Sequence, residues 1–245
     1  MKQSTVRKVL AVSLLVNVLA VAGVIRSIDA RGGWEYLRAR WEGAPDRGGV
    51  NLDWANYVHR QTLFECLPKR TGRVVFAGDS LTQGCEWGEL YPGVLNRGIG
   101  GDTSAGLLQR SGSLAELRPR ALFLMIGSND LLNLGLGPEQ TLANIRAAVA
   151  KIRSQSPETR IYLESNMPTW NVRVNAHSRG VNQGLRAMAD SKTIFYIDLY
   201  PAFLKGEVLN PAYSADGGHL NGAGYMLWKR LLDPYVEPLL AEPRS

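Results

Sequence analysis

A serine, an aspartate and a histidine in this sequence have the types and the order that nucleophilic catalysis requires. Ser80 stands in the segment Gly78-Asp79-Ser80-Leu81, directly after the apolar run 74–77, whereas Asp216 and His219 lie near the C-terminus. A serine hydroxyl is a poor nucleophile until a base takes its proton, and the base must itself be oriented. The pattern therefore predicts Ser80 as the nucleophile, His219 as the general base and Asp216 as the carboxylate that orients the histidine.

Two further segments offer donors to a negatively charged oxygen. Residues 96–103 contain Gly100 and Gly101, and residues 126–130 contain Asn129. Glycine lets the backbone approach a substrate closely, and an asparagine amide supplies a fixed neutral dipole. Together with the backbone N–H of Ser80, these groups predict an oxyanion hole.

These segments, in this order, resemble the SGNH hydrolases, also called GDSL esterases/lipases, over roughly residues 70–235. The four residues that name the family find counterparts in Ser80, Gly101, Asn129 and His219. The resemblance favours Gly101 as the glycine of the oxyanion hole. It implies acyl transfer through a covalent acyl-enzyme, which water would turn into ester hydrolysis.

Three other residues bear on this assignment. Asp198 ends a predicted strand at the same sheet edge and ranks below Asp216 as the orienting carboxylate. Thr82 stands where the nucleophile elbow of the α/β-hydrolases has glycine, which argues against that family. Asp79 is expected to stabilise the turn rather than to react.

The cysteines and histidines do not predict a metal site. The three histidines (His59, His177 and His219) are scattered, and Cys66 and Cys85 lack metal-ligand spacing. We therefore expect neither a metal nor another cofactor. An exported protein permits a disulfide between the two cysteines, but two free thiols are favoured.

Substrate contacts are predicted in two loops, residues 131–137 and 166–173, which follow the third and fourth predicted strands. Trp87 and Trp170 are candidate substrate-binding residues, with core packing as the alternative for each. Tryptophan, asparagine and arginine would suit a sugar ring, and the leucines of the first loop would suit an acyl chain.

Three functions agree with these residues. The first is an esterase that removes short acyl groups, chiefly O-acetyl, from carbohydrate. The second is a lysophospholipase or a broad short-chain arylesterase. The third is an envelope acyltransferase or a glycan-binding protein, although four intact site residues argue against inert binding.

Alternating apolar runs and amphipathic segments predict the fold. Strands are expected at 73–77, 94–96, 121–126, 161–164 and 194–198, and helices at 51–67, 104–116, 138–154, 175–190 and 221–232. This alternation predicts an α/β protein, a three-layer α/β/α sandwich with a flavodoxin-like, five-stranded parallel sheet. Ser80, Gly101 and Asn129 then fall at the carboxyl edge of the sheet, and His219 on a loop before the last helix.

The N-terminal residues divide the chain into three parts: 1–25 as a signal anchor or signal peptide, 26–50 as a juxtamembrane linker, and 51–245 as the hydrolase domain. Basic residues 2, 7 and 8 precede an apolar run over 9–25. The small-x-small pattern at 20–22 is typical of a cleavage site, but the apolar run continues past it, which favours the uncleaved anchor. Either form predicts a domain outside the cytoplasm, periplasmic or at the cell surface.

The positive charge is concentrated near the N-terminus. The chain carries a formal net charge of +6, and residues 1–33 contain five of its 28 basic and one of its 22 acidic side chains. The remaining 23 basic and 21 acidic side chains nearly balance. No basic stripe is interleaved with aromatic residues, so a nucleic-acid partner is not expected. The oligomeric state is not predicted.

Overall fold

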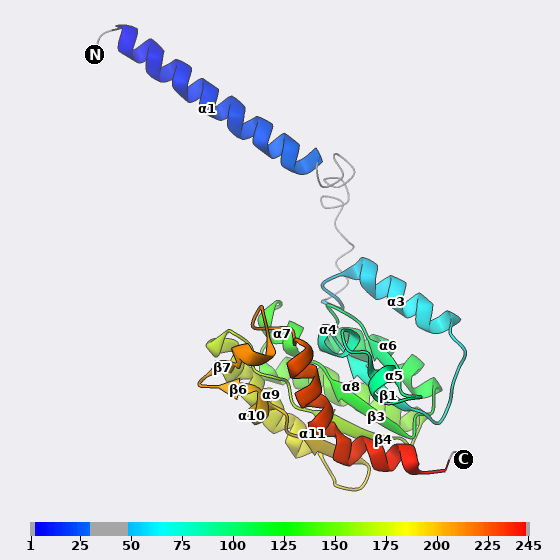
Figure 1. Ribbon diagram of the computed structural model, residues 1–245. Coiled ribbons are helices and arrows are strands. Elements are labelled where there is room, and N and C mark those ends of the chain that lie inside the picture. Colours follow the sequence, from blue (N-terminus) through cyan, green and yellow to red (C-terminus); the bar gives the residue numbers. More distant parts are fainter. Residues whose placement is uncertain (1–2, 30–48, 244–245) are drawn as a thin grey trace. The chain divides into compact units, whose positions relative to one another are not determined.

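The computed structural model describes residues 3–29 and 49–243, shown in colour in Figure 1. The chain divides into two units, residues 1–47 and 48–245. Most of the predicted linker, residues 30–48, lies outside the described residues.

In the first unit, α1 (Gln3–Asp29) forms one continuous helix. Its large apolar side chains between Val12 and Ile25 are exposed. Among the described residues, no helix combines the length and the apolar character needed to cross a membrane.

The second unit is built on a parallel sheet of five strands. These are β1 (Val74–Gly78), β2 (Leu95–Gly98), β3 (Ala121–Met125), β4 (Arg160–Glu164) and β5 (Ile194–Ile197). Their order in the sheet is β2-β1-β3-β4-β5, and all four pairings are parallel. This is the flavodoxin-like order, so the predicted fold class is confirmed.

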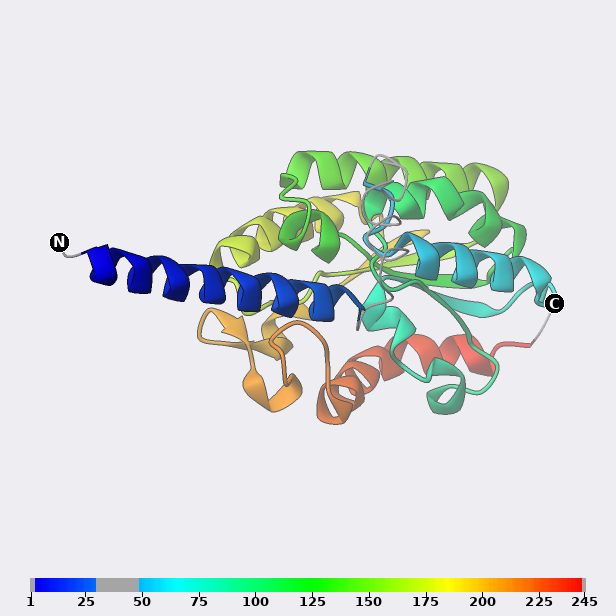
Figure 2. The same cartoon turned by 90° about the horizontal axis from the view of Figure 1, so that it is seen from above.

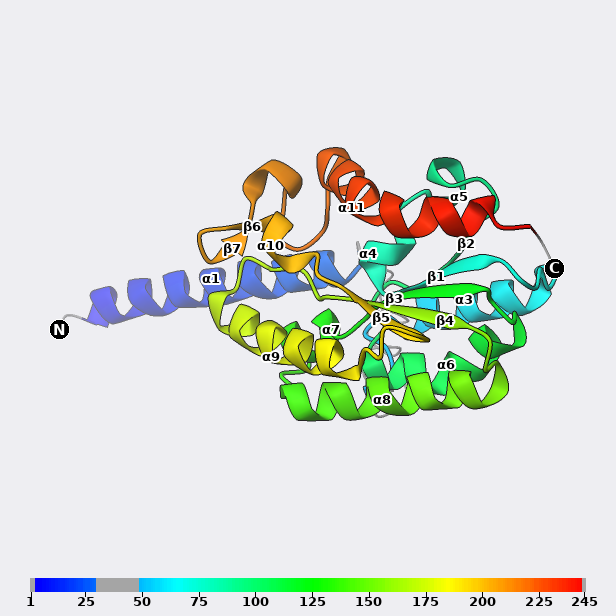
Figure 3. The same ribbon diagram turned by 90° about the horizontal axis from the view of Figure 1, so that it is seen from below.

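Helices cover both faces of this sheet. The longer ones are α3 (Trp54–Cys66), α6 (Ser104–Glu116), α8 (Pro138–Gln155), α9 (Val172–Met188) and α11 (Gly222–Ala241). Figure 3 shows α6, α8 and α9 on one side and α11 on the other, and Figure 2 shows the same layers with α8 in green and α11 in red. The α3 helix contacts α6 through the Tyr57 hydroxyl, which donates to the Gly106 carbonyl.

Side chains alternate between the two faces along each strand, so each face has its own core. On the α6/α8/α9 side, Val75 and Ala77 pack with Leu107, Ile145 and other aliphatic residues. On the α11 side the core is aromatic. There the rings of Phe76, Phe123, Tyr162 and Phe195 stack across four strands at centroid distances of 4.9, 4.6 and 4.8 Å.

Several short elements lie in the loops, and the apolar periodicity of the sequence did not predict them. They are α4 (Ser80–Gln83), α5 (Trp87–Leu90), α7 (Ser128–Leu132), α10 (Tyr200–Phe203), the hairpin of β6 (Leu204–Lys205) and β7 (Val208–Leu209), and the 3-10 helix η1 (Pro211–Tyr213). Cys66 is exposed, Cys85 is buried, and both thiols are free.

Candidate active site

The turn after β1 places Ser80 at the carboxyl edge of the sheet. Ser80 is the first residue of α4, and the Asp79 carboxylate caps this helix by accepting from the N–H of Leu81 at 3.0 Å. A Cβ atom at Gly78 would lie 2.2 Å from the carbonyl oxygen of Met125, so this tight turn needs glycine. Burial raises the pKa of Asp79 to about 7. Its capping bond agrees with the predicted structural role.

Ser80, His219 and Asp216 form a continuous chain of hydrogen-bond contacts. The Oγ atom of Ser80 lies 3.0 Å from Nε2 of His219, and Nδ1 of His219 lies 2.8 Å from Oδ2 of Asp216. The other carboxylate oxygen of Asp216 accepts from the backbone N–H groups of Gly218 and His219 at 2.8 and 2.7 Å. These bonds, led by the one to the ring of His219, hold the pKa of Asp216 well below its usual range. The carboxylate therefore stays ionised at neutral pH.

The predicted glycine donor lies in a left-handed turn. Gly101 has φ +74°, a conformation that side chains rarely adopt. The N–H of neighbouring Gly100 already donates to Oε1 of Gln83 at 2.6 Å. Within the described part of the chain, the N–H of Gly101 has no acceptor. Of the two glycines, Gly101 thus carries the N–H that is free to bind a ligand.

Asn129 holds its amide in a defined orientation. Its Nδ2 donates to the carbonyl oxygen of Asp102 at 2.8 Å, and its Oδ1 accepts from Nδ2 of Asn133 at 2.9 Å. An amide nitrogen has two hydrogens, so one remains for a ligand. The next residue, Asp130, is buried and accepts from both the N–H and the hydroxyl of Ser104 at the start of α6.

A small cavity joins these groups. Its volume is about 190 Å³, and Ser80, Asn129 and His219 all line it. Both predicted loops contribute to its wall: Leu132 and Asn133 from the first, and Met167, Pro168 and Thr169 from the second. The prediction that these loops surround the site agrees with this arrangement. The site is open, because the side chains of His219 and Asp216 are 62% and 58% exposed.

The prediction that Trp87 contacts substrate is wrong. Its side chain is fully buried, its ring stacks on Phe76 at 4.2 Å, and its Nε1 donates to the Thr82 carbonyl. The large apolar ring instead fills the aromatic core on the α11 side, beside Trp228. The position of Trp87 close to Ser80 in the sequence did not reveal that α5 directs this side chain into the core.

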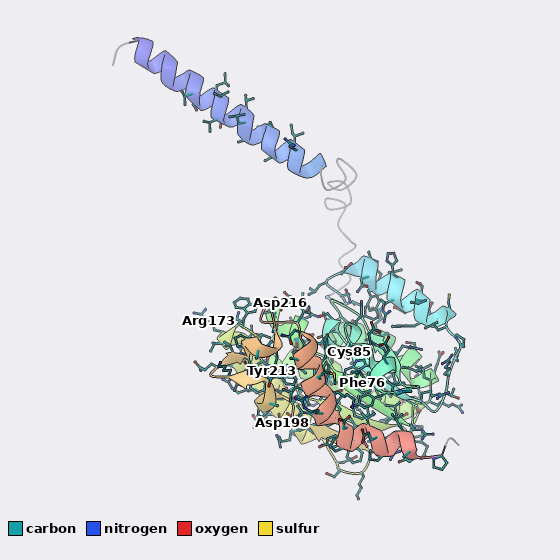
Figure 4. All side chains as sticks on the ribbon, viewed as in Figure 1. Phe76, Cys85, Arg173, Asp198, Tyr213 and Asp216 are labelled. Atoms are coloured by element: carbon teal, nitrogen blue, oxygen red, sulfur yellow. The ribbon has the colours of Figure 1, made fainter. Side chains whose placement is uncertain are left out.

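Trp170 and Asp198 lie in different surroundings. Trp170 is 60% exposed, and its N–H donates to the Gly217 carbonyl in the loop that carries His219. It does not line the cavity, but it lies next to that loop. Asp198 forms an ion pair with Arg186 at 2.5 Å, and Figure 4 shows it well apart from Asp216. Asp216 alone of the two carboxylates contacts the histidine.

Sequence reasoning missed two polar residues of this site. Asn133 orients Asn129, and Arg110 is bonded to Asp102 by its Nε atom at 2.7 Å. Arg110 carried a signal in the sequence, because it falls on the same helical stripe as the buried Leu107 and Leu114. Asn133 carried none, because an asparagine in a loop is usual.

A family model matches the part of the chain that contains these residues. The model of the GDSL-like lipase/acylhydrolase family matches residues 76–227, a range that contains Ser80, Gly101, Asn129, Asp216 and His219. The chain belongs to this family. It is thus an SGNH/GDSL hydrolase, which confirms the resemblance seen in the sequence, and a carboxylic ester hydrolase.

Several solved structures share this fold. A proposed acylhydrolase from Bacteroides fragilis NCTC 9343 is 29% identical with a TM-score of 0.65, over 77% of this chain and 99% of that one. A GDSL-like lipase from Bacteroides thetaiotaomicron VPI-5482 is 26% identical with a TM-score of 0.64, over 76% and 99%. A carbohydrate esterase family 3 protein from Talaromyces cellulolyticus is 16% identical with a TM-score of 0.55, over 69% and 97%, and shows the fold alone. No curated protein matches the sequence.

Proposed function

We propose that this GDSL hydrolase cleaves carboxylic esters with Ser80 as nucleophile, His219 as general base and Asp216 as the orienting carboxylate. The observation that carries this proposal is the unbroken contact chain from Ser80 Oγ through His219 to Asp216. An ionised Asp216 keeps the proton of the neutral imidazole on Nδ1, which leaves the lone pair of Nε2 facing the serine hydroxyl.

The reaction then runs in two halves. His219 takes the Ser80 proton as Oγ attacks the ester carbonyl, and the resulting oxyanion is bound by the N–H groups of Ser80 and Gly101 and the amide of Asn129. The tetrahedral intermediate collapses to an acyl-enzyme, while His219 passes its proton to the departing alkoxide. Water, deprotonated by His219, attacks the carbonyl of the acyl-enzyme. The second tetrahedral intermediate collapses and releases the carboxylic acid, while His219 returns the proton to Ser80 Oγ.

We further propose that the acyl group is short and that the natural substrate is an O-acetylated carbohydrate. A cavity of about 190 Å³ is smaller than most sites for drug-sized ligands. The exposed ring of Trp170 offers a flat apolar surface next to the loop of His219, of the kind on which a sugar ring stacks.

A lysophospholipase or short-chain arylesterase is the alternative. Leu81, Leu132, Met167 and Pro168 give the cavity an apolar side, and the open rim would let a longer chain extend into solvent. An open site would equally admit a sugar acceptor to the acyl-enzyme, which would make the protein an acyltransferase.

A series of p-nitrophenyl esters from C2 to C12 tests these proposals, with the full chain and its Ser80→Ala variant compared at equal concentration. Activity that is highest at C2–C4 and absent in the variant supports the short-acyl esterase. A maximum at C8 or longer supports the lysophospholipase. Undiminished turnover by Ser80→Ala would show that another residue is the nucleophile.

Acetylated glycans provide the second stage of the test. Release of free acetate from an acetylated xylan or peptidoglycan supports carbohydrate ester hydrolysis. Acetate transfer to an added sugar in excess of its release would instead identify a transferase.

The proposed location of the catalytic domain is outside the cytoplasm. The basic residues 2, 7 and 8 before the apolar run 9–25 support it. Fractionation of cells that express the full chain, with N-terminal sequencing of the product, tests both the location and cleavage near residue 22.

A further inference from the structure

Arg110 is buried directly beneath the proposed oxyanion hole. Its side chain is only 2% exposed, and it donates three hydrogen bonds to three different residues. Nε bonds Oδ2 of Asp102 at 2.7 Å, one terminal nitrogen bonds the carbonyl of Arg97 at 2.8 Å, and the other bonds the carbonyl of Gly78 at 3.1 Å. A guanidinium is planar and rigid, so it fixes these three acceptors relative to one another.

The acceptors belong to the segments that carry two of the proposed oxyanion donors. Gly78 ends β1, two residues before Ser80, and Asp102 directly follows Gly101. The Arg97 carbonyl belongs to β2, the strand that leads into the loop with Gly101. One side chain therefore ties the ends of two neighbouring strands together at the point where their N–H groups would bind the same oxygen.

The third proposed donor is connected through the same contact. The carbonyl oxygen of Asp102 accepts from Nδ2 of Asn129 at 2.8 Å, while its carboxylate is held by Arg110. Asp102 thus has its side chain fixed by α6 and its backbone bonded to the amide donor. A shift of Asp102 would move Asn129 and Gly101 together.

The ion pair is hard to explain by stability alone. The side chain of Asp102 is fully buried. The free energy lost by removing two charges from water is about as large as the free energy gained from their attraction. Replacing such a pair by apolar residues of similar volume therefore often leaves the stability of a protein unchanged. Burial raises the pKa of Asp102 to about 6, and Arg110 opposes that rise. A charged pair kept in this position at such a cost is consistent with a geometric role.

We propose that Arg110 is a positioning residue of ester hydrolysis, which through Gly78 and Asp102 sets the spacing of the Ser80, Gly101 and Asn129 donors. This inference rests on the proposed function. Because an oxyanion hole acts mainly in the transition state, displaced donors lower kcat more than they weaken substrate binding.

The test compares Arg110→Lys and Arg110→Met with the full-length wild-type protein. Lysine keeps a positive charge for Asp102 but cannot bond three acceptors in one plane. We expect kcat for p-nitrophenyl acetate to fall by about 10²-fold in both variants with KM changed less than about threefold, as for loss of one oxyanion donor. Arg160→Met is the control, because Arg160 pairs with Glu242 at the surface and is the first residue of β4, at the edge of the sheet opposite the site.

A second readout separates positioning from folding. An alkyl boronic acid forms a tetrahedral adduct with a reactive serine, so its affinity should fall by about the same factor as kcat. Arg110→Lys leaves buried carbonyl oxygens unpaired and should unfold at a lower temperature than the wild type, but it should remain folded at the assay temperature. Full kcat and boronate affinity in a folded Arg110→Lys protein would overturn the inference, even if Arg110→Met fails to fold. If the wild type itself shows no hydrolysis that depends on Ser80, both the proposed function and this inference fail. If the wild type and the Arg110 variants hydrolyse p-nitrophenyl acetate equally well, the inference alone is refuted.

Discussion

Ser80 and His219 are 139 positions apart in the sequence, yet Ser80 Oγ lies 3.0 Å from His219 Nε2. Parallel strands bring the first residue to the sheet edge, and the loop before α11 brings the second. This distance is within the reach of proton transfer without any movement of the backbone. The proposed nucleophile and base are therefore paired in this structure.

The first prediction concerns the orienting carboxylate. Asp216→Asn should lower kcat for p-nitrophenyl acetate by about 10³–10⁴-fold, because an amide nitrogen facing Nδ1 stabilises the wrong imidazole tautomer. Oδ1 of the asparagine can still accept from the N–H groups of Gly218 and His219, so the loop should remain folded. Steady-state kinetics and thermal unfolding check both parts. Asp198→Asn is the matched control, and a comparable loss there would point to the wrong carboxylate.

A second prediction separates the amide donor from the residue that orients it. Asn129→Ala should lower kcat by about 10²–10³-fold with little change in KM. Asn133→Ala should cause a smaller loss of the same kind, because it removes only the bond that holds Oδ1 of Asn129. If either change acts mainly on KM, the residue contacts substrate in the ground state instead.

A buried carboxylate predicts how stability depends on pH. Glu164 at the end of β4 is buried and bonds Nε1 of Trp228 at 2.6 Å, and burial raises its pKa to about 8. Its folded pKa lies above its usual value, so the stability that its neutral form contributes is fully present below about pH 4.5 and is lost as pH rises through about 8. Glu164→Gln should remove this loss. Its thermal midpoint relative to the wild type should therefore be several degrees higher at pH 9 than at pH 5. An equal difference at the two pH values would show that Glu164 is ionised in the folded protein throughout.

The fourth prediction tests the exposed tryptophan. Trp170→Ala should raise KM for an acetylated glycan several-fold and leave kcat/KM for p-nitrophenyl acetate unchanged, because only the larger alcohol part would reach the ring. Val172→Ala, exposed on the same segment, is the control. Equal losses on both substrates would mean that the Trp170 side chain supports the His219 loop by packing beside Gly217 rather than by binding sugar.

Local sequence patterns predicted much of the fold, because the central strands are buried on both faces and read as unbroken apolar runs. The last helix was expected to end at Leu232 but continues to Ala241 through Pro234 and Pro238. Proline loses one backbone bond, yet burial of Val236 and Leu239 and donation from Arg120 to the carbonyl of Leu239 stabilise the extra turns. Such tertiary contacts lie outside any local pattern.

The site was predictable to a different degree. The serine, the histidine, the aspartate and the proposed oxyanion residues carry motif signals that are independent of the side-chain packing. Trp87 was misplaced because exposure depends on how a short helix is turned, and four residues define no periodicity. The role of Asn133 depends on a single contact across one helical turn, which composition does not reveal.

The loop that carries Asp216 and His219 has a consequence for how the site is assembled. Asp216 bonds the ring and the backbone of His219 as well as the N–H of Gly218, and Ser214 bonds Asp216 and Gly217. All these bonds are internal to residues 214–219, and the bond from the Trp170 N–H to the Gly217 carbonyl ties this loop to the segment after β4. Asp216 and His219 are therefore held together within the loop, and the contact that joins them to the rest of the site is the one between the histidine ring and Ser80. Any ligand, partner or solvent condition that shifts this loop would change the distance between the His219 ring and Ser80, and with it the catalytic rate. The contact between Asp216 and His219 would stay intact.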